Sequence, residues 1–154
     1  MKALIPALTL CLAAFSHGAD NNNFSVGLGT DHAGVAGVKY ALNHGKSKYY
    51  ASVALLGYSS AVGGEVGYGI GWERLVASDK HALGLFAGTV SMDENRDEAV
   101  IYHGLAGTYN FYFNGFTERS WVLGGSVYSG VTSDDDSYID NNTSGIFVKV
   151  AFQW

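Results

Sequence analysis

Few charged side chains fall inside the stretches of this chain that alternate between apolar and polar residues. Four charged side chains lie inside these stretches, and each is on the face with small or polar neighbours: Lys39, Glu65, Glu73 and Lys149. An unpaired charge in a narrow interior is costly, so Lys39, Glu73 and Lys149 are expected to form a network across it. Such a network fits either an electrostatic gate in a narrow pore or a satisfied polar core, and we favour the polar core.

His103 is the histidine that lies inside an alternating stretch, on the face with the large apolar residues. A histidine at this position could serve as the base in hydrolysis of a membrane lipid, provided that a nucleophile and an orienting acid are bonded to it. The run from His103 to Gly107 has no serine two residues on, and Ser91 or Ser129 could approach only in a favourable register. We therefore expect no catalytic residue and no enzyme.

The polar stretch 132–143 is the most acidic part of the chain, with Asp134, Asp135, Asp136 and Asp140. Clustered carboxylates can bind a divalent cation, which could bridge to lipopolysaccharide phosphates. The spacing lacks the glycine and the final glutamate of an EF-hand, so a solvated acidic loop fits better. We expect no metal and no cofactor. The histidines at turns and strand ends also lack metal-ligand spacing: His32, His44 and His81.

Eight alternating stretches would position these side chains, and no helical period separates them. Together they predict an all-β fold, an eight-stranded antiparallel up-and-down transmembrane β-barrel. The predicted strands are 23–30, 35–42, 48–58, 63–76, 81–91, 99–113, 120–130 and 144–154.

The two faces of these strands predict which side meets lipid. In 63–76, Val66, Tyr68 and Ile70 share one face, whereas Gly67 and Gly69 share the other. Glycines suit the narrow interior of an eight-stranded barrel, and the large apolar face then points outward to lipid. A soluble periplasmic barrel of the lipocalin kind would have these faces inverted, and it stays open as an alternative.

Aromatic residues are expected to form a girdle at the periplasmic interface of the membrane. The three tryptophans fall at one level of the predicted barrel and on its apolar face, and two tyrosines join them: Trp72, Trp121, Trp154, Tyr40 and Tyr49.

Charge is sorted between the two ends of the predicted barrel. The connections expected on the extracellular side hold only one basic residue, Arg96, and nine acidic ones: Asp31, Asp93, Glu94, Asp97, Glu98, Asp134, Asp135, Asp136 and Asp140. The periplasmic turns and strand ends carry most of the basic residues: Lys46, Lys48, Arg74, Lys80 and Arg119. The acidic balance, with a formal net charge of -5, gives no indication of nucleic-acid binding.

The first 19 residues predict a cleaved secretory signal peptide. Lys2 supplies the positive start, 3–15 is apolar, and 16–19 offers small residues for cleavage. The barrel domain is then 20–154, which contains no cysteine. An alternative in which Cys11 is acylated lacks the small residue expected next to it.

The last strand has an unbroken apolar file and ends on an aromatic residue, as expected of the closing strand of an outer-membrane barrel. With the signal peptide and eight strands, it resembles small outer-membrane barrels of the OmpX and OmpA type. The resemblance implies that the barrel-assembly machinery recognises Val148, Val150, Phe152 and Trp154. The run from Val26 to Asp31, followed by Gly34-Val35-Ala36, is also similar to the first hairpin of YfaZ-like outer-membrane proteins.

These patterns predict a monomer in the bacterial outer membrane that contacts lipid and lipopolysaccharide, with a structural or surface-interaction role. The alternatives are a narrow ion-permeable channel, a lipid-A-modifying enzyme and a soluble periplasmic binding barrel. The first would show discrete conductance that changes when Lys39 or Glu73 is neutralised, and the second would alter lipid A in a way that needs His103.

Overall fold

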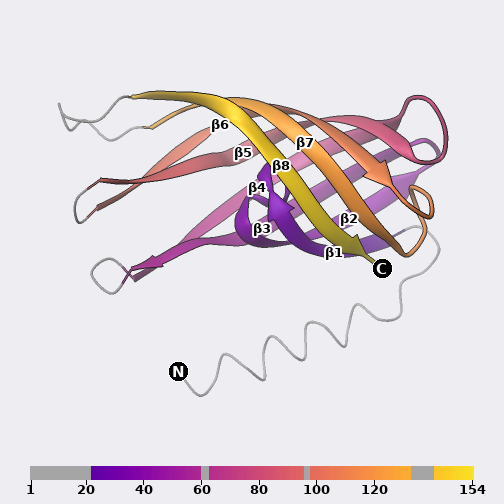
Figure 1. Ribbon diagram of the computed structural model, residues 1–154, viewed down its shortest axis with the longest axis horizontal. Helices are drawn as coiled ribbons and strands as arrows, with labels where there is room; N and C mark the ends of the chain where they lie inside the picture. The colour runs from indigo at the N-terminus through magenta and orange to yellow at the C-terminus, as the bar shows by residue number, and fades with distance from the viewer. Residues whose placement is uncertain (1–21, 60–62, 96–97, 133–140) are drawn as a thin grey trace, which may run out of the picture.

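Eight antiparallel strands in up-and-down order close into a barrel, which confirms the predicted all-β fold (Figure 1). The computed structural model describes residues 22–59, 63–95, 98–132 and 141–154, so the expected signal peptide and Asp134, Asp135, Asp136 and Asp140 lie outside the described residues. No helix in those ranges is long and apolar enough to cross a membrane. The strands are β1 (Asn22–Gly29), β2 (Gly34–His44), β3 (Ser47–Ser59), β4 (Gly63–Leu75), β5 (His81–Asn95), β6 (Glu98–Tyr112), β7 (Ser120–Val131) and β8 (Asn142–Gln153).

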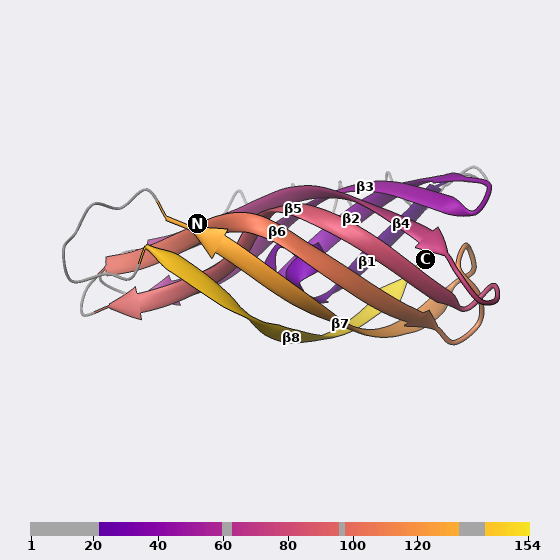
Figure 2. The ribbon, with the colours of Figure 1, turned by 90° about the horizontal axis from the view of Figure 1, so that it is seen from above.

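The strands are strongly tilted, as the view in Figure 2 shows. Following paired residues once around the barrel from Phe24 leads to Ser144 of β8. Phe24 instead pairs with Trp154, through backbone hydrogen bonds of 2.8 and 3.3 Å. This shear of about ten residues goes with a tilt of roughly 35–45° in an eight-stranded barrel.

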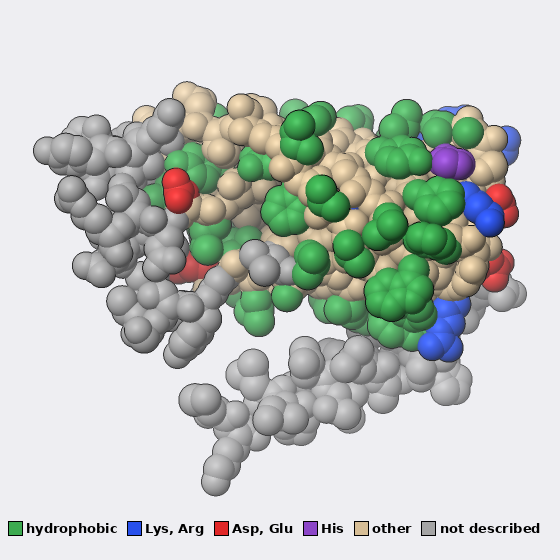
Figure 3. Space-filling view, in the orientation of Figure 1, with side chains coloured by type: hydrophobic (Ala, Val, Ile, Leu, Met, Phe, Trp, Pro, Cys, Tyr) green, Lys and Arg blue, Asp and Glu red, His purple; other side chains and the backbone are tan. Residues whose placement is uncertain are grey.

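Large apolar side chains point outward on every side of the barrel, and Figure 3 shows them spread over one face. The inward positions between them carry glycines, because aromatic rings already fill the lumen. A Cβ at Gly69 would lie 2.2 Å from the ring of Phe86, and one at Gly71 would lie 2.2 Å from the ring of Tyr50. Each Cβ would also lie close to a backbone oxygen, 2.9 Å from that of Ala87 and 2.7 Å from that of Leu85, so a side chain at either position would force the backbone to shift.

Buried side chains fill the lower and middle parts of the lumen. We call the end that holds Asn22 and Gln153 the lower end (right in Figure 1) and the opposite end the upper end. Two apolar clusters lie inside, with polar side chains between them. One consists of Ala33, Ala41, Tyr50, Ala54, Phe86, Val90, Val100, Tyr102 and Ala106. The other consists of Ala82, Tyr112, Phe116, Val122 and Ala151.

The wall of the barrel has unequal height. β5 and β6 have 15 residues each and pair up to Asn95 and Glu98, beyond the predicted ends of these strands. Asp93 therefore lies in a strand and not in a loop, which corrects its predicted position. β1 has only 8 residues and ends at Gly29, and the chain then turns into the lumen as the short 3-10 helix η1 (Thr30–His32).

Candidate functional site

The turn between β1 and β2 folds into the barrel and is buried there. Thr30, Asp31, His32 and Ala33 are all buried, and the amide of Ala33 donates to the carbonyl of Thr30 at 2.9 Å. The chain reverses through Gly29 with φ 130° and Ala33 with φ 63°, values that favour glycine at the first position. We call residues 30–33 the plug.

Glycines on the facing strands make room for the backbone of the plug. A Cβ at Gly37 of β2 would lie 1.9 Å from the carbonyl oxygen of His32, and one at Gly67 of β4 would lie 2.2 Å from that of Ala33. Any larger side chain at either position would collide with main-chain atoms that have little freedom to move. These two glycines therefore decide whether the plug fits.

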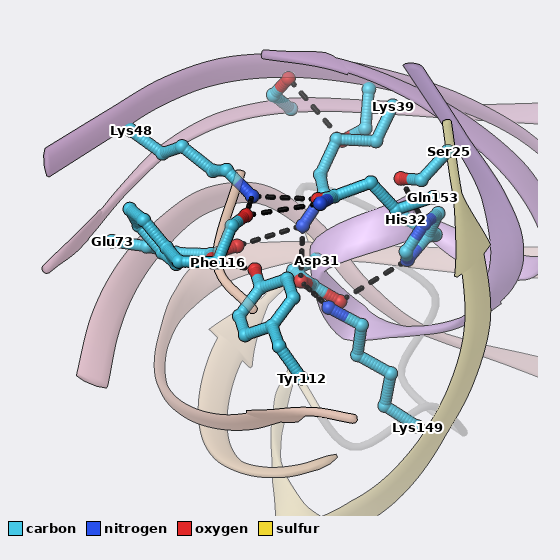
Figure 4. A network of polar contacts seen from close by, with 12 residues as sticks. Ser25, Asp31, His32, Lys39, Lys48, Glu73, Tyr112, Phe116, Lys149 and Gln153 are labelled. Carbon is cyan, nitrogen blue, oxygen red and sulfur yellow. Dashed lines mark hydrogen bonds and ion pairs between the residues drawn. The ribbon is translucent and has the colours of Figure 1, made fainter. Parts of the chain in front are cut away.

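The plug carries an aspartate into the group of charges predicted for the lumen. Oδ2 of Asp31 accepts hydrogen bonds from Nζ of Lys39 at 2.9 Å and from Nζ of Lys149. Lys39 also donates to Oε1 of Glu73 at 2.7 Å. Figure 4 shows Asp31 between the two lysines. We call these four residues, none of them more than 4 % exposed, the lumen cluster.

The lumen cluster is balanced, with two carboxylates and two ammonium groups in contact. The structure brings Lys39, Glu73 and Lys149 together as the sequence suggested, but Lys149 joins the others through Asp31. Asp31 lies in the connection predicted for it, but the short first hairpin turns this connection inward and buries Asp31 in the lumen. Glu65 lies apart, half-exposed on β4 and outside the ion pairs found among the described residues.

A second polar layer closes the lower end. Nζ of Lys48 donates to Oε1 of Gln153 at 2.6 Å and to the carbonyl of Phe116, in the turn between β6 and β7. Nε2 of Gln153 donates to the carbonyls of Phe116 and Glu118 at 2.9 and 2.7 Å. We call Lys48, Phe116 and Gln153 the lower seal. The sequence placed Lys48 at a periplasmic strand end, whereas the structure buries it in the lumen.

An aromatic residue connects the two layers. The hydroxyl of Tyr112 donates to Oε2 of Glu73, and the Tyr112 ring packs edge-on against Phe116 with ring centroids 5.2 Å apart. Nζ of Lys48 lies 4.4 Å from the centroid of the Tyr112 ring, a cation–π contact. The plug, the lumen cluster and the lower seal therefore form one continuous contact along the lumen.

Ser25, His32 and Asp31 are bonded in the order of a hydrolase triad. Oγ of Ser25 lies 3.0 Å from Nε2 of His32, and Nδ1 of His32 lies 3.3 Å from Oδ1 of Asp31. A triad must also reach a substrate, but these side chains are at most 3 % exposed. The two lysines that hold the other oxygen of Asp31 fit a structural role, in which Ser25 and His32 fix the plug.

His103 lies on the outer surface near the upper end. Its Nδ1 is 3.4 Å from Oγ1 of Thr89, and its ring centroid is 5.4 Å from that of Tyr68. Ser91 pairs with Tyr102 in the sheet, and no serine hydroxyl or carboxylate of the described residues bonds to His103. Among the described residues, the neighbours of His103 do not include the bonded nucleophile and acid that hydrolysis needs.

The aromatic residues predicted for the girdle lie on the outer surface. Around the last strand they stack edge-on, with ring centroids 5.1 Å apart for Trp121 and Phe152 and 4.7 Å apart for Phe152 and Trp154. Trp72, Tyr40 and Tyr49 point outward on neighbouring strands. The other residues predicted for assembly, Val148 and Val150, point outward from β8.

Within the described residues, no group of three or more His, Cys, Asp or Glu side chains is placed to hold a metal ion. Comparisons of the chain with protein-family models, curated proteins and solved structures found no match.

Sequence reasoning assigned Lys39, Glu73 and Lys149 to this site and missed most of the others. Ser25, His32, Lys48 and Gln153 were not assigned to it, although Ser25 and Gln153 fall on the small-residue face by parity. The sequence held one signal. The first strand is short and has Gly29 at its end, and Gly37 lies on the inner face of the next strand. A short hairpin beside inner-face glycines is compatible with a connection that turns into the lumen.

Proposed function

We propose that this protein is a β-barrel of the bacterial outer membrane with a structural or surface-interaction role and a lumen closed to solutes. The observation that carries the proposal is that the apolar face of the strands points outward and the charged side chains point inward, the opposite of a soluble barrel. Large apolar side chains such as Ile146, Leu105 and Ile70 are largely exposed, whereas the charges of the lumen cluster are buried. Soluble proteins rarely expose apolar surface on this scale, and a bilayer is the solvent that it fits.

The aromatic residues support an orientation for the barrel. Trp121, Phe152 and Trp154 gather near the lower end, where the chain termini of the barrel also lie. Aromatic girdles mark the interfaces of a bilayer, and barrels of this kind keep their short turns on the periplasmic side. The lower end would then face the periplasm.

The closed lumen argues against the channel alternative. The plug and the lower seal fill the barrel at two levels, and the charges between them are paired. We expect no discrete conductance steps from the protein in planar bilayers, and no change when Glu73→Gln is introduced. Steps that shift in size with Glu73→Gln would favour the channel.

Fractionation tests the proposal directly. The protein expressed in a Gram-negative host should sediment with outer membranes, need detergent for extraction, and migrate differently on gels with and without heating. Recovery in the periplasmic fraction without detergent would favour the soluble barrel.

A charge placed on the outer surface makes a sharper test. Leu85 points outward and is 62 % exposed, so in a soluble protein Leu85→Arg would cost little stability. In a bilayer, an arginine on the lipid face costs about 2–4 kcal/mol near the midplane. Val76→Arg, in the turn that follows β4, is the matched control and should have little effect.

A further inference from the structure

The barrel wall is interrupted on one side of the upper half. β1 ends at Gly29 and β2 begins at Gly34, while β8 on one side and β3 on the other continue upward to Asn142 and Ser59. The last pair between β1 and β8 is Leu28 with Val150. We call the gap between the upper parts of β8 and β3 the notch. Figure 3 shows the surface hollowed at this place.

On the edge of β8 that borders the notch, backbone groups have no partner among the residues that the structure describes. Phe24 and Trp154 exchange both of their backbone hydrogen bonds, so residues an even number of positions back along β8, including Val148 and Ile146, direct their amides to the same side. Above Val150, this side faces the notch, and no described strand pairs there with Ile146 or Val148. Their side chains are 80 % and 70 % exposed.

A pocket of about 120 Å³ lies behind the notch. Gly29 at the end of β1 and Thr30 of the plug line this pocket, and Thr30 is held there by a 2.7 Å hydrogen bond to Ser126. Leu56 of β3 and Phe147 of β8 stand at the two sides of the notch and line the pocket, and Val90 and Tyr128 line it from β5 and β7.

The depth of the notch follows from the length of β1. Eight residues of a tilted strand rise about 20 Å along the barrel axis. The apolar band of an outer-membrane barrel is about 25 Å tall, so β1 ends below its upper limit if the lower end lies at the periplasmic interface. The notch then opens toward the outer leaflet, close to the boundary between acyl chains and headgroups.

We propose that the notch admits the end of an acyl chain from an outer-leaflet lipid, which binds in the pocket above the plug. This inference rests on the proposed position of the barrel in the membrane. A cavity of about 150 Å³ holds benzene, so the pocket accepts about four to six carbons. Backbone groups need partners at this depth, and the ester or amide carbonyls of neighbouring outer-leaflet lipids supply acceptors for the amides of Ile146 and Val148.

A photoreactive lipid tests the proposal. The protein would be folded into vesicles of phosphatidylethanolamine and phosphatidylglycerol that contain a phosphatidylethanolamine with a diazirine at the end of one acyl chain. After illumination, mass spectrometry would locate the labelled residues. We expect label on the inward-facing Leu56, Val90 or Phe147, in addition to outward-facing residues such as Val127.

Two adjacent substitutions separate the pocket from the outer surface. Leu56→Trp fills the pocket and should reduce the label inside it about tenfold, because the indole occupies the space of the chain. Leu55→Trp adds the same group on the outer surface, where Leu55 is 62 % exposed, and should leave the internal label unchanged. Phe147→Trp is a second pocket-filling variant should Leu56→Trp not fold.

The possible results are distinguishable. Label on outward residues alone would overturn the inference while leaving the barrel in the membrane. Internal label that both pocket-filling variants leave unchanged would also overturn it. A protein that stays in the aqueous phase and carries no label would instead contradict the proposed membrane location.

Discussion

The carboxylate of Asp31 and the ammonium of Lys39 lie 2.9 Å apart in the middle of the barrel. Asp31 belongs to the turn that follows β1, and Lys39 belongs to the strand that the turn leads into. The same carboxylate oxygen accepts from Lys149 of the last strand. The first turn is therefore tied to both neighbouring strands, and the plug and the closure of the barrel depend on the same contacts.

Loss of the Asp31 charge should destabilise the barrel. Asp31→Asn leaves two buried lysines with one carboxylate, and breaking a buried ion pair costs about 3–5 kcal/mol. The midpoint of urea unfolding in detergent or lipid should fall accordingly. Asp79→Asn, in the exposed turn between β4 and β5, is the control and should leave the midpoint in place. Equal midpoints for the two variants would show that the lumen cluster does not stabilise the fold.

The glycines beside the plug should tolerate no side chain. Gly37→Ala places a methyl group 1.9 Å from the carbonyl oxygen of His32, so either the plug moves or stability falls by about 1–3 kcal/mol. Gly107→Ala is the matched control, because its methyl would lie 3.8 Å from the nearest atom, a Val127 methyl. Unfolding midpoints measured side by side compare the two, and a harmless Gly37→Ala would place the plug elsewhere.

The lower seal should protect the turn between β6 and β7 from proteolysis. Gln153→Leu removes both hydrogen bonds to the carbonyls of that turn. It also removes Oε1, the acceptor of a hydrogen bond from Lys48. A lost buried partner costs about 1–3 kcal/mol, so trypsin should cut after Arg119 roughly tenfold faster. Thr117→Ala changes an exposed side chain in the same turn and serves as the control. Unchanged cleavage in Gln153→Leu would argue that backbone contacts alone hold the turn.

His103 should have no part in lipid chemistry. Expression of the protein should leave the mass profile of lipid A unaltered, and His103→Ala should give the same profile, because Thr89 and Tyr68 are its neighbours rather than a serine and an acid. A mass change that appears with the native protein and disappears with His103→Ala would support the enzyme alternative.

Strand number, strand order and the direction of each face could be predicted from the sequence. Alternation with a period of two follows from the geometry of a strand, so Ile70 and Gly69 must point to opposite sides wherever the strand is placed. The ends of β5 and β6 could not be predicted, because the polar residues around Asp93 look like a loop when strand pairing is unknown.

The sequence by itself determined which residues face the lumen: the parity of Lys39, Glu73 and Lys149 within their strands needs no knowledge of the partners. Only the tertiary structure decided how these charges are balanced. Asp31 joins them through the inward path of one turn and pairs with Lys149 of the last strand, a contact between residues far apart in the chain. The alternating pattern within a strand does not predict such contacts, because they depend on how neighbouring strands are paired. A shift of one residue in that pairing would bring different residues together.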